Sequence, residues 1–124
     1  MHFDLRTQEA VRQVVLYTEQ LRDASERVSE AVTADATALE SFFAKHDTVY
    51  SDLSTAHSAG DTAEHAVEYL DLYTHGADLR GYLRFDTWGV YVEGGRPLSE
   101  TTVELSLGPT VHERVRFATD PAEL

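Results

Sequence analysis

The stretch "HGADLRGYLRF", residues 75–85, decides the predicted fold, because the spacing of apolar side chains changes there. Before Gly76 apolar residues recur every three or four positions, as on one face of a helix. From Leu79 on they alternate with polar residues, as along a strand with one buried face. Gly76 also suits the left-handed conformation that often ends a helix. The sequence therefore predicts one domain, with a helical part over residues 1–76 and a β part over residues 77–124.

The first expected helix begins after Thr7, a suitable N-cap. Its apolar stripe consists of Val11, Val14, Val15, Leu21, Val28 and Val32, with Thr18 and Ser25 filling the gaps. From Val14 on, the stripe approaches the 4-3 repeat of coiled coils. Leu16 points away from this stripe and could mark a second contact surface. A helix this long needs a partner, which is either the next helix or a second chain.

Two further helices are expected before Gly76. A capping box of Thr37 and Glu40 starts the second helix, and Gly60 ends it. Its predicted buried face consists of Leu39, Phe42, Phe43, Val49, Tyr50, Leu53 and Ala56. Asp61 starts the third helix, whose predicted buried face consists of Ala63, Ala66, Val67, Leu70 and Tyr73. Residues 33–37, "TADAT", are either a turn, which gives a helical hairpin, or only a kink.

The β part predicts three or four antiparallel strands. They are expected over residues 79–85, 88–92, 101–107 and 111–117, with turns at "GG" (residues 94–95) and "GP" (residues 108–109). An apolar sheet face must be covered, and the helices are the available cover. The predicted fold class is α+β: two or three N-terminal helices, a long hairpin plus a shorter helix, packed on a C-terminal antiparallel meander.

The composition is strongly acidic, with 22 acidic and 10 basic side chains and a formal net charge of −12. Nine of the basic residues are arginines and only Lys45 is a lysine, a pattern typical of proteins adapted to molar salt. This charge disfavours binding to nucleic acid and to anionic membrane surfaces. The absence of cysteine, of an apolar run of about 18 residues and of a signal-peptide pattern predicts a cytoplasmic protein.

No catalytic motif is present: the chain has no nucleophile elbow, no P-loop and no dinucleotide-binding fingerprint. The candidate ligand pocket lies between the second helix and the sheet, and its residues are His46, Tyr50, His57 and Trp88. A buried imidazole can bind ligands or metal near neutral pH. The competing interpretation is that His46 simply packs in the core.

A metal site is the second candidate, because His57, His65 and Glu68 are residue types that bind zinc, with Asp61 and His75 nearby. On a third helix His65 and Glu68 would be neighbours. Against this, Asp61 is explained fully as a helix cap, and no established zinc motif occurs. We therefore expect no cofactor.

A cationic strip is the third candidate. Two predicted strands carry alternating basic residues, Arg80 and Arg84 on one and His112, Arg114 and Arg116 on the other. If those strands lie close together, the strip would bind carboxylate or phosphate groups. The competing interpretation is cross-strand pairing of these bases with Glu93, Glu104 and Glu113.

The function predicted from these features is a non-enzymatic interaction or assembly module that forms a homo-oligomer, with a dimer favoured. The alternative is a small-ligand or metal-binding domain that uses the pocket beside the second helix. Neither hypothesis names a partner protein or a substrate.

Overall fold

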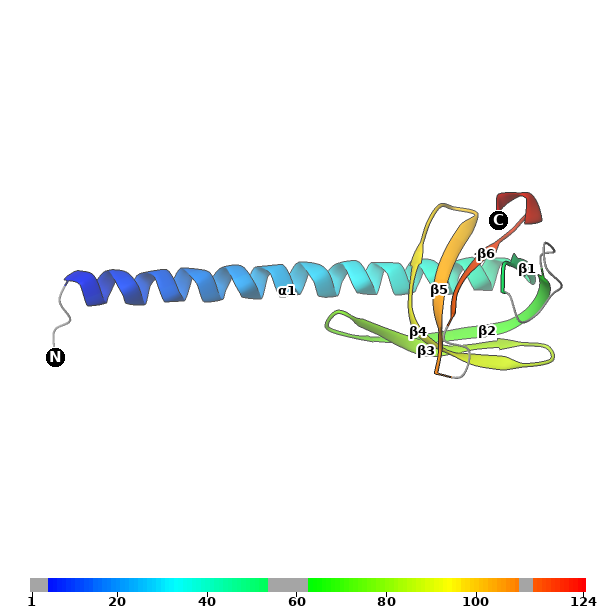
Figure 1. The fold of residues 1–124 in the computed structure, drawn as a ribbon, viewed down its shortest axis with the longest axis horizontal. Helices are drawn as coiled ribbons and strands as arrows, with labels where there is room; N and C mark the ends of the chain where they lie inside the picture. Colours follow the sequence, from blue (N-terminus) through cyan, green and yellow to red (C-terminus); the bar gives the residue numbers. More distant parts are fainter. Residues whose placement is uncertain (1–4, 54–62, 110–112) are drawn as a thin grey trace.

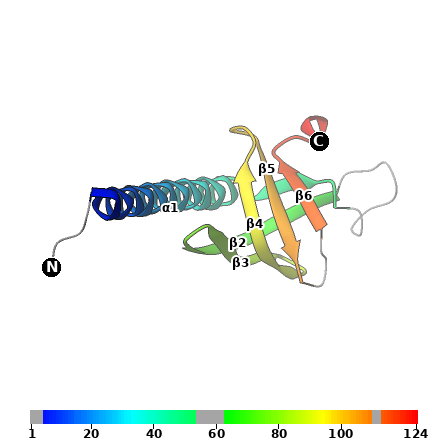
Figure 2. The same cartoon turned by 60° about the vertical axis from the view of Figure 1, so that its left-hand side comes forward.

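The computed structural model describes residues 5–53, 63–109 and 113–124. One helix, α1 (Leu5–Lys45), precedes six strands: β1 (Thr48–Ser51), β2 (Ala63–His75), β3 (Asp78–Phe85), β4 (Gly89–Pro97), β5 (Thr102–Gly108) and β6 (Glu113–Ala118). A short 3-10 helix (Pro121–Glu123) follows. Each strand pairs antiparallel with the next along the chain, and β6 pairs with β1, so that the sheet closes into a barrel (Figures 1 and 2).

The predicted fold class is therefore wrong. The described residues hold neither a helical hairpin nor a third helix, and six strands replace a meander of three or four. The change from helix to strand occurs between Lys45 and Thr48 and not after Gly76. The four segments expected to be strands after Gly76 correspond to β3, β4, β5 and β6. The turn expected at residues 94–95 is wrong, because Gly94 and Gly95 lie inside β4 and pair with β5.

The "TADAT" stretch is neither a turn nor the start of a new helix. The Thr33 hydroxyl donates to the Ser29 carbonyl at 2.9 Å, and the Thr37 hydroxyl donates to the Thr33 carbonyl at 3.1 Å. Both hydroxyls are thus satisfied inside the helix by bonds to the preceding turn. Since no glycine or proline interrupts residues 5–45, α1 continues through this stretch.

A β-bulge explains why the sequence of β2 wrongly predicts a helix. The pairing of β2 with β3 shifts register between Val67 and Tyr69. Ala63 and His65 are buried before the bulge, followed by the partly buried Val67. Leu70 is buried after the bulge, three positions beyond Val67, which imitates helical spacing. The predicted stripe of the third helix therefore combines inward-facing residues from both sides of the bulge with Ala66 and Tyr73, which are exposed.

Barrel closure depends on β1, whose residues also fall in a segment wrongly predicted to be helical. Tyr50 pairs with Ala118 and Ser51 with Phe117 across the β1–β6 join. Next to it, the Asp52 carboxylate accepts a hydrogen bond of 2.8 Å from the backbone N–H of Arg116. The strand consists mainly of threonine, valine and tyrosine, types that favour strands.

The core lies inside the barrel and under the last turns of α1. Phe85, Phe117, Leu83, Leu105, Val49, Val115 and Leu39 are among its fully buried side chains. From the helix, Phe43 reaches Phe117 with ring centroids 5.5 Å apart. The four buried residues of α1, from Ala36 to Phe43, all belong to its last third. The rest of the helix extends away from the barrel, so that the first turn of α1 is the part of the helix farthest from it (Figure 1).

Candidate functional site

The projecting helix, which we define as residues 5–28 of α1, touches no other part of the described structure closely enough to be buried. Every one of its residues is exposed. Helices in water obtain most of their stability from packing an apolar face, and isolated helices are marginal. A helix of 41 residues is about 60 Å long, and only its C-terminal third packs on the barrel. The projecting helix is therefore the part of the fold that lacks its packing surface.

A regular apolar seam follows this helix. We define the seam as Val11, Val14, Thr18, Leu21, Ser25, Val28 and Val32, whose spacing alternates between three and four residues throughout. This is the a/d repeat of a coiled coil over three heptads. Among the exposed large apolar side chains are Val14 at 64%, Leu21 at 52% and Val28 at 46%. Single exposed apolar residues are normal, but a continuous seam is typical of an interaction surface.

The residues that flank the seam are almost all uncharged. They are Ala10, Val15, Tyr17, Arg22, Ala24, Ser29 and Ala31, so that Arg22 is the one charge among them. The remaining charges of the segment lie on the other faces of the helix: Arg6, Glu9, Arg12, Glu19, Asp23, Glu26, Arg27 and Glu30. In a solvated helix charges are spread over all faces, whereas here one wide face is free of all but a single charge.

The part of α1 that carries the seam is also nearly neutral in charge. Residues 5–32 carry five acidic and four basic side chains, a net charge of −1, in a chain whose net charge is −12. Two such helices therefore repel each other far less than two barrels would. This charge distribution favours contact between copies through the helix.

The polar seam residue Thr18 has its hydroxyl satisfied within the helix. The hydroxyl donates to the Val14 carbonyl at 2.9 Å. Burying Thr18 against a partner helix thus leaves no unsatisfied donor, which would otherwise cost about 1–3 kcal/mol.

The seam runs directly into the face that packs on the barrel. Val32, its last member, packs partly buried against the core. One heptad later Leu39 is fully buried, and Ala36 and Phe43 lie on the same side of the helix. The barrel therefore sits on the seam side of α1.

The predicted pocket residues do not share one pocket. His46 follows the end of α1, half-buried, with its ring 5.2 Å from that of Phe42. It lines a hollow of about 660 Å³ between the end of α1 and the loop after β4. Trp88 lies elsewhere, with its ring 4.9 Å from Phe85, and neither Trp88 nor Tyr50 lines that hollow. His57 lies outside the described residues.

The basic residues do not form one strip either, because β3 and β6 are not neighbours in the barrel. On β3, Arg80 donates to the Glu93 carbonyl at 2.7 Å, and Arg84 lies 3.6 Å from the Glu68 carboxylate on β2. The predicted His112 lies outside the described residues.

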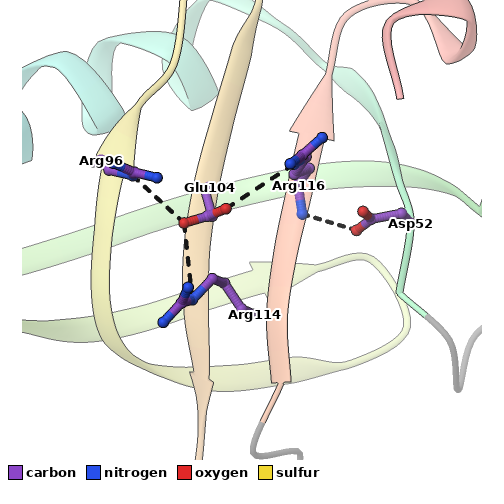
Figure 3. Close-up of polar contacts among 5 residues, drawn as sticks. All are labelled: Asp52, Arg96, Glu104, Arg114 and Arg116. Carbon is purple, nitrogen blue, oxygen red and sulfur yellow. Dashed lines mark hydrogen bonds and ion pairs between the residues drawn. The ribbon is translucent and has the colours of Figure 1, made fainter.

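A different basic cluster surrounds Glu104 on β5. Its carboxylate lies 3.5 Å from Arg96, 3.9 Å from Arg114 and 4.0 Å from Arg116, measured to the Nε atoms (Figure 3). Three cations share one carboxylate, so that the cluster has a local charge of +2 in an acidic chain. Arg96 reaches Glu104 through the register of β4 against β5, and no local pattern in the sequence indicates that register.

The predicted metal residues His65 and Glu68 lie on strand β2 and not on a helix. His65 is 5% exposed inside the barrel, whereas Glu68 is exposed on the outside. Within the described ranges, no group of three or more His, Cys, Asp or Glu side chains is arranged to hold a metal ion. His57 and Asp61 fall in the gap between these ranges.

His65 instead forms a buried polar pair that the sequence does not predict. Its Nε2 lies 2.6 Å from the hydroxyl of Ser51, which is fully buried. The imidazole stacks on Phe85 with ring centroids 4.5 Å apart. A serine and a histidine at this distance resemble a nucleophile and its base, but here both side chains are packed into the core. The pair joins β1 to β2, and we assign it a structural role.

In the part of the chain that the structure describes, no helix is both long and apolar enough to cross a membrane. Residues 1–122 match the family model described as "Family of unknown function (DUF7532)". No curated protein and no solved structure matches the chain.

Proposed function

We propose that this chain, which belongs to the DUF7532 family, is a non-enzymatic assembly module that dimerises through its projecting helix in the cytoplasm of a salt-adapted cell. The observation that carries the proposal is the continuous seam, exposed from Val11 to Val28 and flanked by a single charge. Coiled-coil pairing needs this pattern, and a solvated helix does not.

The occupant that we propose for the seam is a second copy of the chain. The seam is self-complementary, since a Val/Leu stripe packs well on another of its kind. The low net charge of residues 5–32 lets two copies approach through the helix despite the acidic barrels. At molar salt the Debye length is about 3 Å, so the remaining repulsion is screened.

The matched residues Leu16 and Leu21 provide the test. Both are 52% exposed, but Leu21 lies in the seam and Leu16 lies on another face of the helix. Leu21→Glu buries a carboxylate in the dimer contact, whereas Leu16→Glu leaves it in solvent. The two substitutions share the same change in helix propensity.

Light scattering coupled to size-exclusion chromatography in 2 M salt measures the outcome. We expect the natural chain and Leu16→Glu to be dimers. Leu21→Glu should weaken dimerisation by about a hundredfold or more, because an unpaired buried charge costs several kcal/mol. A natural chain that is monomeric at 100 μM contradicts the proposal, and so does an equal loss of dimer in both variants.

A further inference from the structure

We infer that the two helices of the dimer run antiparallel, seam against seam, so that the end of each helix meets the barrel of the other copy. This inference rests on the proposed dimer and adds its geometry. It follows from the position of the barrel relative to the seam.

The barrel excludes a parallel pair. It is seated on the seam side of α1, where it buries Ala36, Leu39 and Phe43 directly beyond Val32. In a parallel pair the seams would face each other, and each copy's barrel would lie between the two helices at the same end. Packed helices have axes only 8–10 Å apart, and this gap holds side chains and no further layer. Two barrels cannot fit there.

An antiparallel pair places the barrels at opposite ends. The free seam, residues 11–28, then faces the same stretch of the second copy over about 25 Å at 1.5 Å per residue. Residues 5–10 of each helix then lie opposite residues 29–34 of the other copy, where Val32 meets that copy's barrel. Figure 1 shows the open length of helix that such a partner would cover.

The seam residues select a register for this arrangement. Antiparallel coiled coils pair each a position with a d position of the partner helix. If Val11 faces Val28 of the second copy, Val14 faces Ser25, and Thr18 faces Leu21. Every layer then contains at least one large apolar side chain. A parallel pair would instead place Thr18 against Thr18 and Ser25 against Ser25.

The flanking residues fit the same register. On one side of the seam Tyr17 lies next to Ala24 of the second copy, so that a large side chain meets a small one. On the other side Arg22 lies beside Val15, which its aliphatic stem can cover while the guanidinium stays in water. No flanking pair places like charges together.

Single-cysteine variants test the orientation, because the natural chain has no cysteine. Val11→Cys and Val28→Cys are prepared separately, one with a size tag, and oxidised mildly in 2 M salt alone and as a mixture. We expect a disulfide only in the mixture, between one chain of each variant. Fast cross-linking of each variant with itself, and no disulfide between the two variants in the mixture, would show a parallel pair and overturn the inference.

A spin label at the outer-face position of Glu9 gives an independent measurement on the full chain. In the antiparallel register, positions 9 of the two copies are offset by 21 residues, about 30 Å along the axis. In a parallel pair the axial offset is zero. A dimer with a separation below about 20 Å overturns the orientation and leaves the proposed dimer standing, whereas a monomer by light scattering removes both.

Discussion

The hydroxyl of Ser51 and the Nε2 atom of His65 lie 2.6 Å apart inside the barrel, and this bond joins β1 to β2. Ser51 is fully buried and His65 is 5% exposed. The same serine oxygen accepts a hydrogen bond of 3.4 Å from the backbone N–H of Leu53. The barrel core therefore contains a polar link at the short strand that closes the sheet.

Removing this link should weaken the fold. We expect Ser51→Ala to lower the free energy of unfolding by about 1–3 kcal/mol, because a buried ring nitrogen loses its bond to the serine. Ser99→Ala removes an exposed hydrogen bond of 3.2 Å from the backbone N–H of Thr101 and should cost less, about 0.5 kcal/mol, because water replaces the lost partner. Urea unfolding followed by Trp88 fluorescence measures both. Equal stability of the two variants would show that the buried bond contributes nothing.

Gly89 in β4 makes room for Tyr82. A Cβ atom at Gly89 would overlap the ring and hydroxyl of Tyr82, whereas a Cβ at Gly94 would meet nothing nearer than 3.7 Å. Because the atoms concerned lie at the far end of a partly exposed side chain that can turn aside, we expect Gly89→Ala to destabilise the chain by only about 1 kcal/mol. Gly94→Ala, on the same strand, is the control and should be close to neutral.

A double-mutant cycle with Tyr82 tests whether crowding against its ring causes the loss of stability. In the double variant Gly89→Ala with Tyr82→Ala the crowding disappears. The double variant should therefore lose less unfolding free energy than the sum of the losses of the two single variants. Additive losses in thermal or urea unfolding would contradict the assignment.

The Glu104 cluster should depend on salt. Glu104→Gln leaves Arg96, Arg114 and Arg116 without their shared carboxylate, and the three cations then repel one another. Because the arginine side chains are more than half exposed, we expect a loss of only about 1 kcal/mol at low salt, which shrinks as salt screens it.

The control for this prediction is Glu100→Gln, which makes the same charge change at an exposed position. Unfolding midpoints at about 0.6 M and 3 M salt, both in the range where the chain is expected to be folded, compare the two variants. If Glu104→Gln lowers the stability equally at both salt concentrations, the Glu104 side chain stabilises the fold through packing and not through its charge.

The folded chain should lose secondary structure when the salt concentration is lowered. A net charge of −12 repels itself, and screening weakens as the Debye length grows from about 3 Å at 1 M to about 10 Å at 0.1 M. We expect the circular dichroism signal to fall below about 0.5 M salt. A signal that stays constant down to millimolar salt would contradict salt adaptation.

Part of this fold can be predicted from the sequence. Strands β3, β5 and β6 are predictable because apolar residues alternate along them. Strand β4 is predicted only in part, because it continues through Gly94 and Gly95, which are expected to form a turn. Strand β2 is not predictable, since its bulge between Val67 and Tyr69 imitates helical spacing. The continuity of α1 is hidden because Thr37 and Glu40 look like a capping box, although the Thr37 hydroxyl bonds to the preceding turn.

The candidate sites also differ in how far the sequence predicts them. The seam depends only on local spacing, so the sequence alone predicts most of it. The Glu104 cluster and the Ser51–His65 pair depend on which strands are neighbours and in what register. Such long-range pairing is not encoded in local periodicity, and single residues within it carry no signal of their own.

The uninterrupted course of α1 from the seam into the barrel core has a mechanical consequence. No glycine or proline lies between residues 5 and 45, so no hinge separates the pairing segment from the barrel. In the antiparallel register the two Leu39 anchors are 39 residues of helix apart, about 58 Å. The dimer therefore holds its two barrels, and any molecules bound to them, at a fixed separation and in opposite orientations.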